Sequence, residues 1–216
     1  MTATTTEITT INHFINGTET PGDGTRTQPV YNPATGAVSG ELRLANRADL
    51  DATVAAARAA ADSWGDISLS KRTAVLFKFR ELVAAHVEDL AQLITAEHGK
   101  VLSDAKGEIG RGLEVIEFAC GIPTLLKGDY SDQVSTGIDV FSFREPLGVV
   151  AGITPFNFPV MVPLWMAPMA IATGNAFILK PSERDPVRLD AAGQAVEAGR
   201  PARRRVPGPA RRQGNR

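Results

Sequence analysis

The sequence has a single cysteine, no basic and apolar leader, and no marked excess of charge, and each absence argues against a class of protein. One cysteine, Cys120, among 216 residues excludes a disulfide within the chain and fits a reducing compartment. The first 17 residues lack a basic start followed by an apolar core, so we expect no signal peptide and a cytoplasmic location. With 23 basic and 24 acidic residues, nothing in the charge balance indicates nucleic acid as a partner.

Charged residues are also absent from Gly148 through Leu179. This stretch does not predict a membrane helix, because such a helix needs about 20 unbroken apolar residues whose backbone groups bond internally. Gly174-Asn175 closes the stretch, and four prolines interrupt it: Pro155, Pro159, Pro163 and Pro168. We therefore expect no membrane partner.

The stretch is better explained as a strand, a turn, a helix and a second strand. Residues 148–153 form a short β-rich run, Pro159 suits the first turn of a helix over 161–172, and 176–179 form another buried strand. Apolar runs between turn signals are typical of parallel strands covered on both faces. The pattern predicts an α/β protein.

Helical spacing dominates the sequence before this unit. Asn46 suits the N-cap of a first helix, and a second is expected to run from Ser68 or Ser70 to Gly99. A third helix is expected to be capped by Ser103 and to place four apolar residues on one face: Ala105, Ile109, Leu113 and Ile116. Three helices are thus expected before the sheet.

Strands are expected on either side of these helices. Residues 13–17 and 30–32 have the composition of two strands of a hairpin, with turn residues between and after them. Residues 134–143 alternate enough to predict one exposed strand, which bends at 144–146.

Two motifs follow the predicted strands, TPFNFP at 154–159 and GNAFILKPSE at 174–183. They resemble two of the most recognisable motifs of the aldehyde dehydrogenase superfamily. NPATG at 32–36 and GEIGRGLEVIEFA at 107–119 extend the resemblance to its methylmalonate-semialdehyde dehydrogenases. The likeness covers roughly residues 13–186.

The resemblance implies the N-terminal part of an aldehyde dehydrogenase fold. Residues 1–186 would form an incomplete Rossmann-like cofactor domain with leading helices, and an arm near 134–146 would pair with a neighbouring subunit in a homodimer or tetramer. NAD is the implied cofactor, CoA the co-substrate and a small semialdehyde the substrate, which the complete enzyme converts to propionyl-CoA or acetyl-CoA. The family's catalytic cysteine segment has no counterpart here, so we expect this chain by itself to be inactive.

Asn157 is the candidate catalytic residue. A side-chain amide at a strand-to-helix turn can donate a hydrogen bond to a developing oxyanion, and such a donor is commonly worth about 3–4 kcal/mol in the transition state. The resemblance assigns Asn157 to the tetrahedral intermediate that forms when a thiolate attacks the aldehyde. The alternative is a turn asparagine that caps the following helix.

The candidate cofactor-binding residues follow the two predicted strands. Lys180, Glu183 and Arg184 come after the second strand, at the edge where open α/β sheets bind ligands. The resemblance implies that Lys180 and Glu183 hold the adenosine ribose, and that Thr154 and Phe156 line the nicotinamide. Because Glu183 would repel a 2′-phosphate, NAD is favoured over NADP. The alternative is an ordinary solvated strand end.

Arg111 is the candidate substrate-binding residue. It lies between Gly110 and Gly112, and each glycine costs a helix about 1 kcal/mol relative to alanine, so we expect something to approach the helix backbone closely. The resemblance assigns Arg111 to the carboxylate of the semialdehyde, which a guanidinium can bind with two hydrogen bonds. The alternative is a surface pair with Glu108 or Glu114.

The remaining reactive side chains predict no further site. Cys120 ends an apolar helix without a histidine near it in sequence, so we expect a small buried residue and no nucleophile. His13, His86 and His98 lack the spacing of metal ligands, so we expect no metal site.

Residues 187–216 differ in composition, with eight arginines, no lysine and two acids. Read one base later with synonymous codons chosen freely, residues 201–216 encode Leu-Pro-Asp-Gly-Val-Phe-Gln-Val-Leu-His-Gly-Asp-Lys-Glu-Thr, which resembles the family's next strand and turn. We expect a frameshifted tail, and genomic DNA without a compensating insertion or deletion would contradict this. A disordered basic segment for nucleic acid or a membrane surface is the alternative.

Two other functions remain open. One is a different aldehyde dehydrogenase, such as a succinate-semialdehyde or aliphatic enzyme, and Arg111 discriminates because an aliphatic pocket gains nothing from it. The other is a non-catalytic module that binds nucleotide or dimerises through residues 134–143. Cofactor binding without turnover would support the second.

Overall fold

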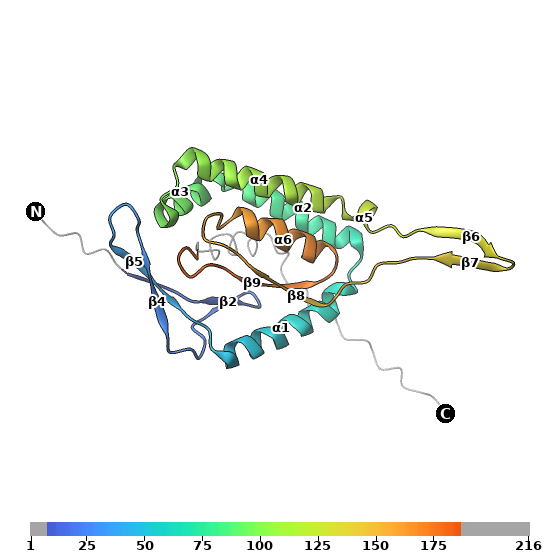
Figure 1. Cartoon of the computed structure of the whole chain (residues 1–216), viewed down its shortest axis with the longest axis horizontal. Helices are drawn as coiled ribbons and strands as arrows, with labels where there is room; N and C mark the ends of the chain where they lie inside the picture. Colours follow the sequence, from blue (N-terminus) through green and yellow to red (C-terminus); the bar gives the residue numbers. More distant parts are fainter. Residues whose placement is uncertain (1–7, 187–216) are drawn as a thin grey trace, which may run out of the picture.

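The structure is a computed structural model that describes residues 8–186, and its centre is a pair of parallel strands between helices. β8 (Val149–Ile153) pairs with β9 (Ala176–Lys180), so that Ile153 lies opposite Lys180. α6 (Met161–Ala172) connects the strands and packs on one face, while α1 (Arg47–Gly65) packs on the other (Figure 1). The expected order of strand, helix and strand is confirmed, and with it the α/β class.

The prolines of this unit take other positions than expected. Pro159 lies in the turn before α6, whose N-cap is Val160, and the proline in the first turn is Pro163. A proline is tolerated there because the first N–H groups of a helix have no partner within it. Pro168 lies inside the helix and is buried, so its side chain contributes to packing.

A layer of four helices covers the side of α6 away from the sheet (Figure 1). They are α2 (Leu69–Ala85), α3 (Val87–His98), α4 (Leu102–Cys120) and α5 (Ile122–Leu125). The single helix expected up to Gly99 is wrong, because the chain leaves the helical conformation at His86 and starts again at Val87. In the described part of the chain, five helices therefore precede β8. Gly99 ends α3 in the left-handed conformation, as expected.

The N-caps expected from the sequence are found at one helix and not at another. Asn46 caps α1 as expected, and the side chain of Asp49 accepts from the backbone of Asn46 in return. In contrast, α4 begins after Val101, and Ser103 lies inside its first turn. The expected apolar face of α4 is confirmed, because its residues join one buried cluster: Ala105, Ile109, Leu113 and Ile116.

The N-terminal strands pair differently from the expectation. They are β1 (Thr9–Ile11), β2 (His13–Ile15), β3 (Thr18–Thr20), β4 (Thr27–Tyr31) and β5 (Val38–Arg43). β2 pairs with β3 through Asn16-Gly17, where both residues have positive φ, and β5 pairs with β1 and β4. The hairpin expected between 13–17 and 30–32 is wrong, because the Asn-Gly turn closes a tighter hairpin.

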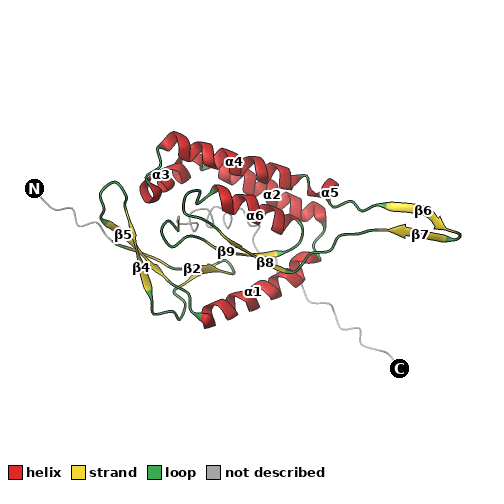
Figure 2. Cartoon of the chain, in the orientation of Figure 1, coloured by secondary structure: helices red, strands yellow, loops and turns green. Residues whose placement is uncertain are grey.

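A two-stranded arm extends from the body (Figure 2). β6 (Tyr130–Ser135) pairs with β7 (Ile138–Phe141), and Gly137 turns the chain between them with φ of 74°. The single strand expected over 134–143 is therefore two strands. Every side chain of both strands is exposed, including several apolar ones.

Between residues 8 and 186, no helix has the length and apolar character needed to span a bilayer. The tail expected at 187–216 lies outside the described residues.

Candidate functional site

The candidate cofactor-binding and catalytic residues meet at the carboxyl edge of β8 and β9. The two strands end in register, and the Thr154 N–H donates to the Lys180 carbonyl at 3.2 Å. The turns that follow the two strands are therefore neighbours. They lie at the carboxyl edge of the strands, where open α/β sheets bind ligands. Lys180 is the last residue of β9, and the other sequence-predicted residues lie on the two turns: Thr154, Phe156, Asn157, Glu183 and Arg184.

Asn157 has an exposed side chain in the turn between β8 and α6. It does not cap α6. The N-cap of this helix is Val160, whose side chain makes no capping hydrogen bond. The N–H groups of Val160 and Met161 donate instead to the Glu108 carboxylate, at 2.9 and 3.0 Å. Within residues 8–186, the Asn157 amide is therefore not used as a helix cap and can donate to a ligand, which the alternative reading would not allow.

Thr154 and Phe156 offer a hydroxyl and an aromatic face at this edge. Thr154 is buried, and its hydroxyl finds no hydrogen-bond partner within residues 8–186. Phe156 is about half exposed; the Arg184 guanidinium lies 5.5 Å from its ring centroid, and the His98 ring stacks at 6.3 Å. Burial lowers the pKa of His98. A buried hydroxyl without a partner suits a polar ligand group.

Lys180 and Glu183 form an ion pair at the end of β9. Lys180 Nζ lies 2.5 Å from Glu183 Oε1, and both side chains are about half exposed. The hydrogen bond from Lys180 lowers the pKa of Glu183, so this carboxylate stays ionised at neutral pH. An ionised carboxylate accepts hydrogen bonds from sugar hydroxyls and repels phosphate.

Arg111 is not brought to these six residues. It lies exposed on α4, and its guanidinium pairs with Glu114 at 3.1 Å, which is the alternative that the sequence left open. The close approach expected at its flanking glycines is found at Gly112 alone, where a Cβ would come 2.4 Å from Cδ1 of Leu164 on α6. A Cβ on Gly110 would meet nothing within 4 Å, so the expectation is wrong there.

Cys120 is buried in the core beside α2 and α6, as expected. Burial raises the pKa of its thiol, which opposes formation of a thiolate. The side chain therefore lacks the character of a nucleophile.

Sequence reasoning missed the roles of Lys100 and of Glu108, which it considered only as a surface partner of Arg111. Glu108 is buried, and its carboxylate receives Lys100 Nζ at 2.5 Å in addition to the two backbone N–H groups. A signal was present, because Glu108 falls on the same helical face as Ala105, Ile109 and Gly112, and a charge on a buried face requires partners. The identity of those partners depends on the fold.

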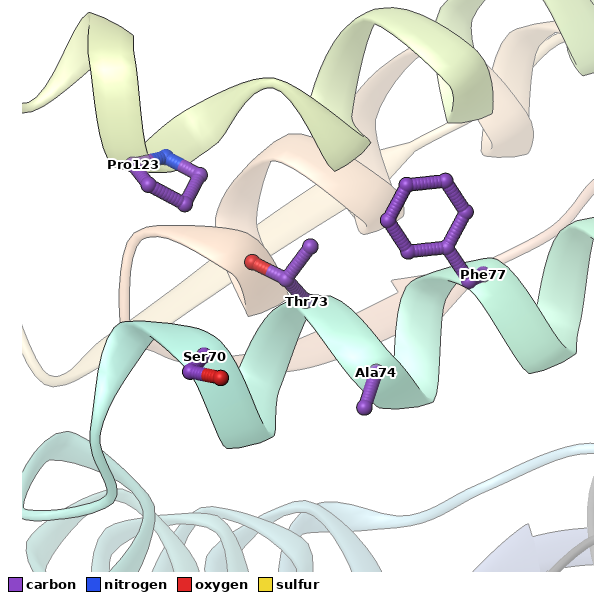
Figure 3. A pocket seen from close by; sticks show the side chains of 5 residues that line it. All are labelled: Ser70, Thr73, Ala74, Phe77 and Pro123. Atoms are coloured by element: carbon purple, nitrogen blue, oxygen red, sulfur yellow. The ribbon is translucent and has the colours of Figure 1, made fainter.

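A hollow on the surface lies elsewhere, between α2 and α5 (Figure 3). It is lined by Ser70, Thr73, Ala74, Phe77 and Pro123, and it contains none of the candidate catalytic, cofactor-binding or substrate-binding residues. Within residues 8–186, no three His, Cys, Asp or Glu side chains are grouped so that they could hold a metal ion.

Comparison with known proteins identifies the family of this chain. The profile described as "Aldehyde dehydrogenase family" matches residues 20–214, which extends beyond Pro186, where the recognisable motifs end. Malonate-semialdehyde dehydrogenase 2 of Geobacillus thermodenitrificans is 48% identical over 198 residues, which are 91% of this chain and 41% of that protein.

Two crystal structures are similar in sequence and fold. The putative methylmalonate-semialdehyde dehydrogenase of Sinorhizobium meliloti, complexed with NAD, is 47% identical with a TM-score of 0.87; the match covers 90% of this chain and 40% of that one. The methylmalonate-semialdehyde dehydrogenase of Oceanimonas doudoroffii is 51% identical with a TM-score of 0.85 and the same coverage. The chain thus spans about 40% of the length of these relatives. The matched profile covers most of the sequence, and the chain belongs to the aldehyde dehydrogenase family.

Proposed function

We propose that this chain forms the cofactor-binding part of an NAD-dependent dehydrogenase of malonate or methylmalonate semialdehyde. The observation that supports this most directly is the meeting of Thr154, Asn157, Lys180 and Glu183 at one sheet edge, where the Asn157 amide does not serve as a helix cap. The names of the relatives, and the NAD bound in one of them, support the substrate and the cofactor.

The residues at the edge suit the parts of a dinucleotide. Lys180 and Glu183 would hold the adenosine ribose, because the ionised carboxylate can accept from both hydroxyls and would repel a 2′-phosphate. Thr154 and Phe156 would line the nicotinamide side, Thr154 through its unpaired hydroxyl and Phe156 with the Arg184 guanidinium beside its ring. NAD, when bound, supplies the hydride acceptor.

Asn157 would donate a hydrogen bond to the aldehyde oxygen while a thiolate attacks the carbonyl carbon. Such a donor contributes about 3–4 kcal/mol because its bond strengthens as negative charge develops. The buried Cys120 does not supply the thiolate, so the proposal assigns it to a residue outside these 216. The whole reaction would end in loss of carbon dioxide and acyl transfer to CoA, which yields acetyl-CoA or propionyl-CoA.

Arg111 would bind the carboxylate of the semialdehyde by releasing Glu114. Their ion pair is exposed, and exposed pairs contribute at most about 1 kcal/mol, so the exchange costs little. Residues 1–186 would act as one domain, and the arm of β6 and β7 would join subunits into a homo-oligomer.

Titration of the chain with NAD and NADP, followed by calorimetry, tests the cofactor part of the proposal. We expect NAD to bind more tightly than NADP, and Lys180→Met and Glu183→Gln to weaken NAD binding. Lys78→Met is the matched control, because Lys78 forms a similar exposed pair with Glu81 at the same sequence spacing. Equal effects of Lys78→Met and Lys180→Met would contradict the assignment.

The same preparation tests the expected lack of turnover. With NAD, CoA and malonate semialdehyde, we expect no increase in the absorbance of reduced cofactor. Turnover by the purified chain would overturn the assignment of the thiolate to a residue outside it.

A further inference from the structure

A buried carboxylate on α4 holds the start of α6. Glu108 is almost fully buried, and its Oε1 accepts hydrogen bonds from the N–H groups of Val160 and Met161 at 2.9 and 3.0 Å. These two N–H groups belong to the N-cap and the first residue of α6, and they have no partner within the helix. Glu108 therefore caps a helix that lies about fifty residues further along the chain.

Lys100 connects this carboxylate to the turn that contains Asn157. Its Nζ lies 2.5 Å from Glu108 Oε2 and donates to the Asn157 carbonyl oxygen at 3.0 Å. It also lies 4.3 Å from the ring centroid of Phe158, and its side chain is only 11% exposed. Lys100 thus contacts the residues on both sides of the peptide bond between Asn157 and Phe158.

These contacts restrain the backbone of the turn and leave the Asn157 side chain free. The carbonyl of Asn157 is held by Lys100, and the turn is anchored three residues later at Val160 by Glu108. A hydrogen-bond donor accelerates a reaction when it is fixed before the reaction begins, because no reorganisation is then needed. A charge pair is suited to this restraint, since bonds to charged groups are about twice as strong as neutral ones.

We propose that Lys100 and Glu108 are positioning residues that hold the turn of Asn157, so that its side-chain amide is directed at the reacting oxygen. This inference rests on the proposed function of Asn157. Neither residue touches the substrate in this arrangement, and both act through the backbone of residues 157–161.

Hydrogen exchange and NMR of the ¹⁵N-labelled 216-residue chain test the inference without turnover. In Glu108→Gln, we expect the amides of Val160 and Met161 to exchange about tenfold faster, because a charge-assisted hydrogen bond becomes a neutral one. In Lys100→Met, we expect the Asn157 side-chain NH₂ signals to shift and broaden, and Lys100→Arg to restore them in part.

Lys106→Met is the matched control. Lys106 lies on α4 and forms an ion pair with Glu88 at 2.5 Å, as Lys100 does with Glu108, but this pair is exposed. The control substitution should change neither the exchange rates nor the Asn157 signals. Unchanged Val160, Met161 and Asn157 signals in both test variants would overturn the inference. So would unfolding of both variants under conditions where Lys106→Met stays folded, because the pair would then support the whole fold and not this turn.

The outcome is separable from that of the proposed function. If the Asn157 signals respond as expected but the chain fails to bind NAD, the positioning contact stands and the proposed function falls. If NAD binds with the expected dependence on Lys180 and Glu183 while the turn is insensitive to Lys100, the positioning role falls alone.

Discussion

Asp49 and Glu108 are buried carboxylates that accept hydrogen bonds from backbone N–H groups of distant segments. Asp49 Oδ1 accepts from Asp23 at 2.7 Å, and its Oδ2 accepts from Gly24 at 3.1 Å and from Asn46 at 2.8 Å. Asp49 thereby joins the loop after β3 to the start of α1, as Glu108 joins α4 to α6. In both cases one side chain replaces partners that the backbone cannot find locally.

Asp49 makes the stability of the chain depend on pH. The N–H of Asn46, followed by that of Asp23, lowers the pKa of this carboxyl from its ordinary value of 3.8. Its contribution is therefore complete above the ordinary pKa and is lost as the pH falls through the lower value of the folded state. We expect Asp49→Asn to lower the melting temperature by several degrees at neutral pH, and by less in acid.

Thermal unfolding followed by circular dichroism at neutral and acidic pH measures this difference. Asp51→Asn is the control, because Asp51 lies on the same helix in an exposed pair with Arg47. A difference between Asp49→Asn and the unchanged chain that stays constant down to strongly acidic pH would be inconsistent with the assignment.

Among the elements, α4 has the central position. It packs against α2, α3 and α6, and it carries both Glu108 and Arg111. Its contact with α6 depends on Gly112, where the absence of a side chain lets Leu164 approach the helix backbone. The start of α6, and with it the turn of Asn157, is thus placed by a helix that is far away in sequence.

The same glycine-to-alanine change at two positions of α4 distinguishes the effect of packing on stability from that of helix propensity. Gly112→Ala places a methyl group against buried Leu164, so we expect the free energy of unfolding to fall by about 1–3 kcal/mol. Gly110→Ala meets open space, so we expect a gain of about 1 kcal/mol from helix propensity alone. Urea unfolding of both variants measures the two effects, and changes of the same sign would refute this account of the α4 contact with α6.

On the scale of the whole molecule, the arm of β6 and β7 leaves apolar side chains without cover. Its apolar residues are more than half exposed: Tyr130, Val134, Ile138, Val140 and Phe141. A two-stranded ribbon is marginal in water without a partner, so the arm fits a contact with another subunit. Asp129 and Ser142 at its base are hydrogen-bonded to each other, so we expect the body to fold without the arm.

Replacement of residues 130–141 by a short glycine linker tests this role. We expect the chain to become monomeric while its melting temperature stays nearly unchanged, since the linker spans a pair of residues that already meet. Sedimentation equilibrium measures the association and differential scanning fluorimetry the stability. If the armless chain still self-associates, the interface lies elsewhere, for example at the open edges of β8 and β9.

Several elements could be predicted because their signals lie within a few residues. The stretch without charge from Gly148 to Leu179, divided by its turn residues, predicted β8, α6 and β9 in the correct order. Asn46 and Gly99 marked helix ends correctly, because caps bond to backbone groups at most a few residues away. The break at His86 was missed because the apolar stripe continues across it with no proline or glycine.

The sequence by itself determined which residues follow β8 and β9, and parallel pairing makes their meeting at one edge predictable. Only the tertiary structure decided which strands pair at the N-terminus, that Gly112 receives Leu164, and that Glu108 and Lys100 hold the turn of Asn157. The physical reason is that a charge predicted on a buried helix face must have partners, but which groups these are depends on how separate helices and strands pack together.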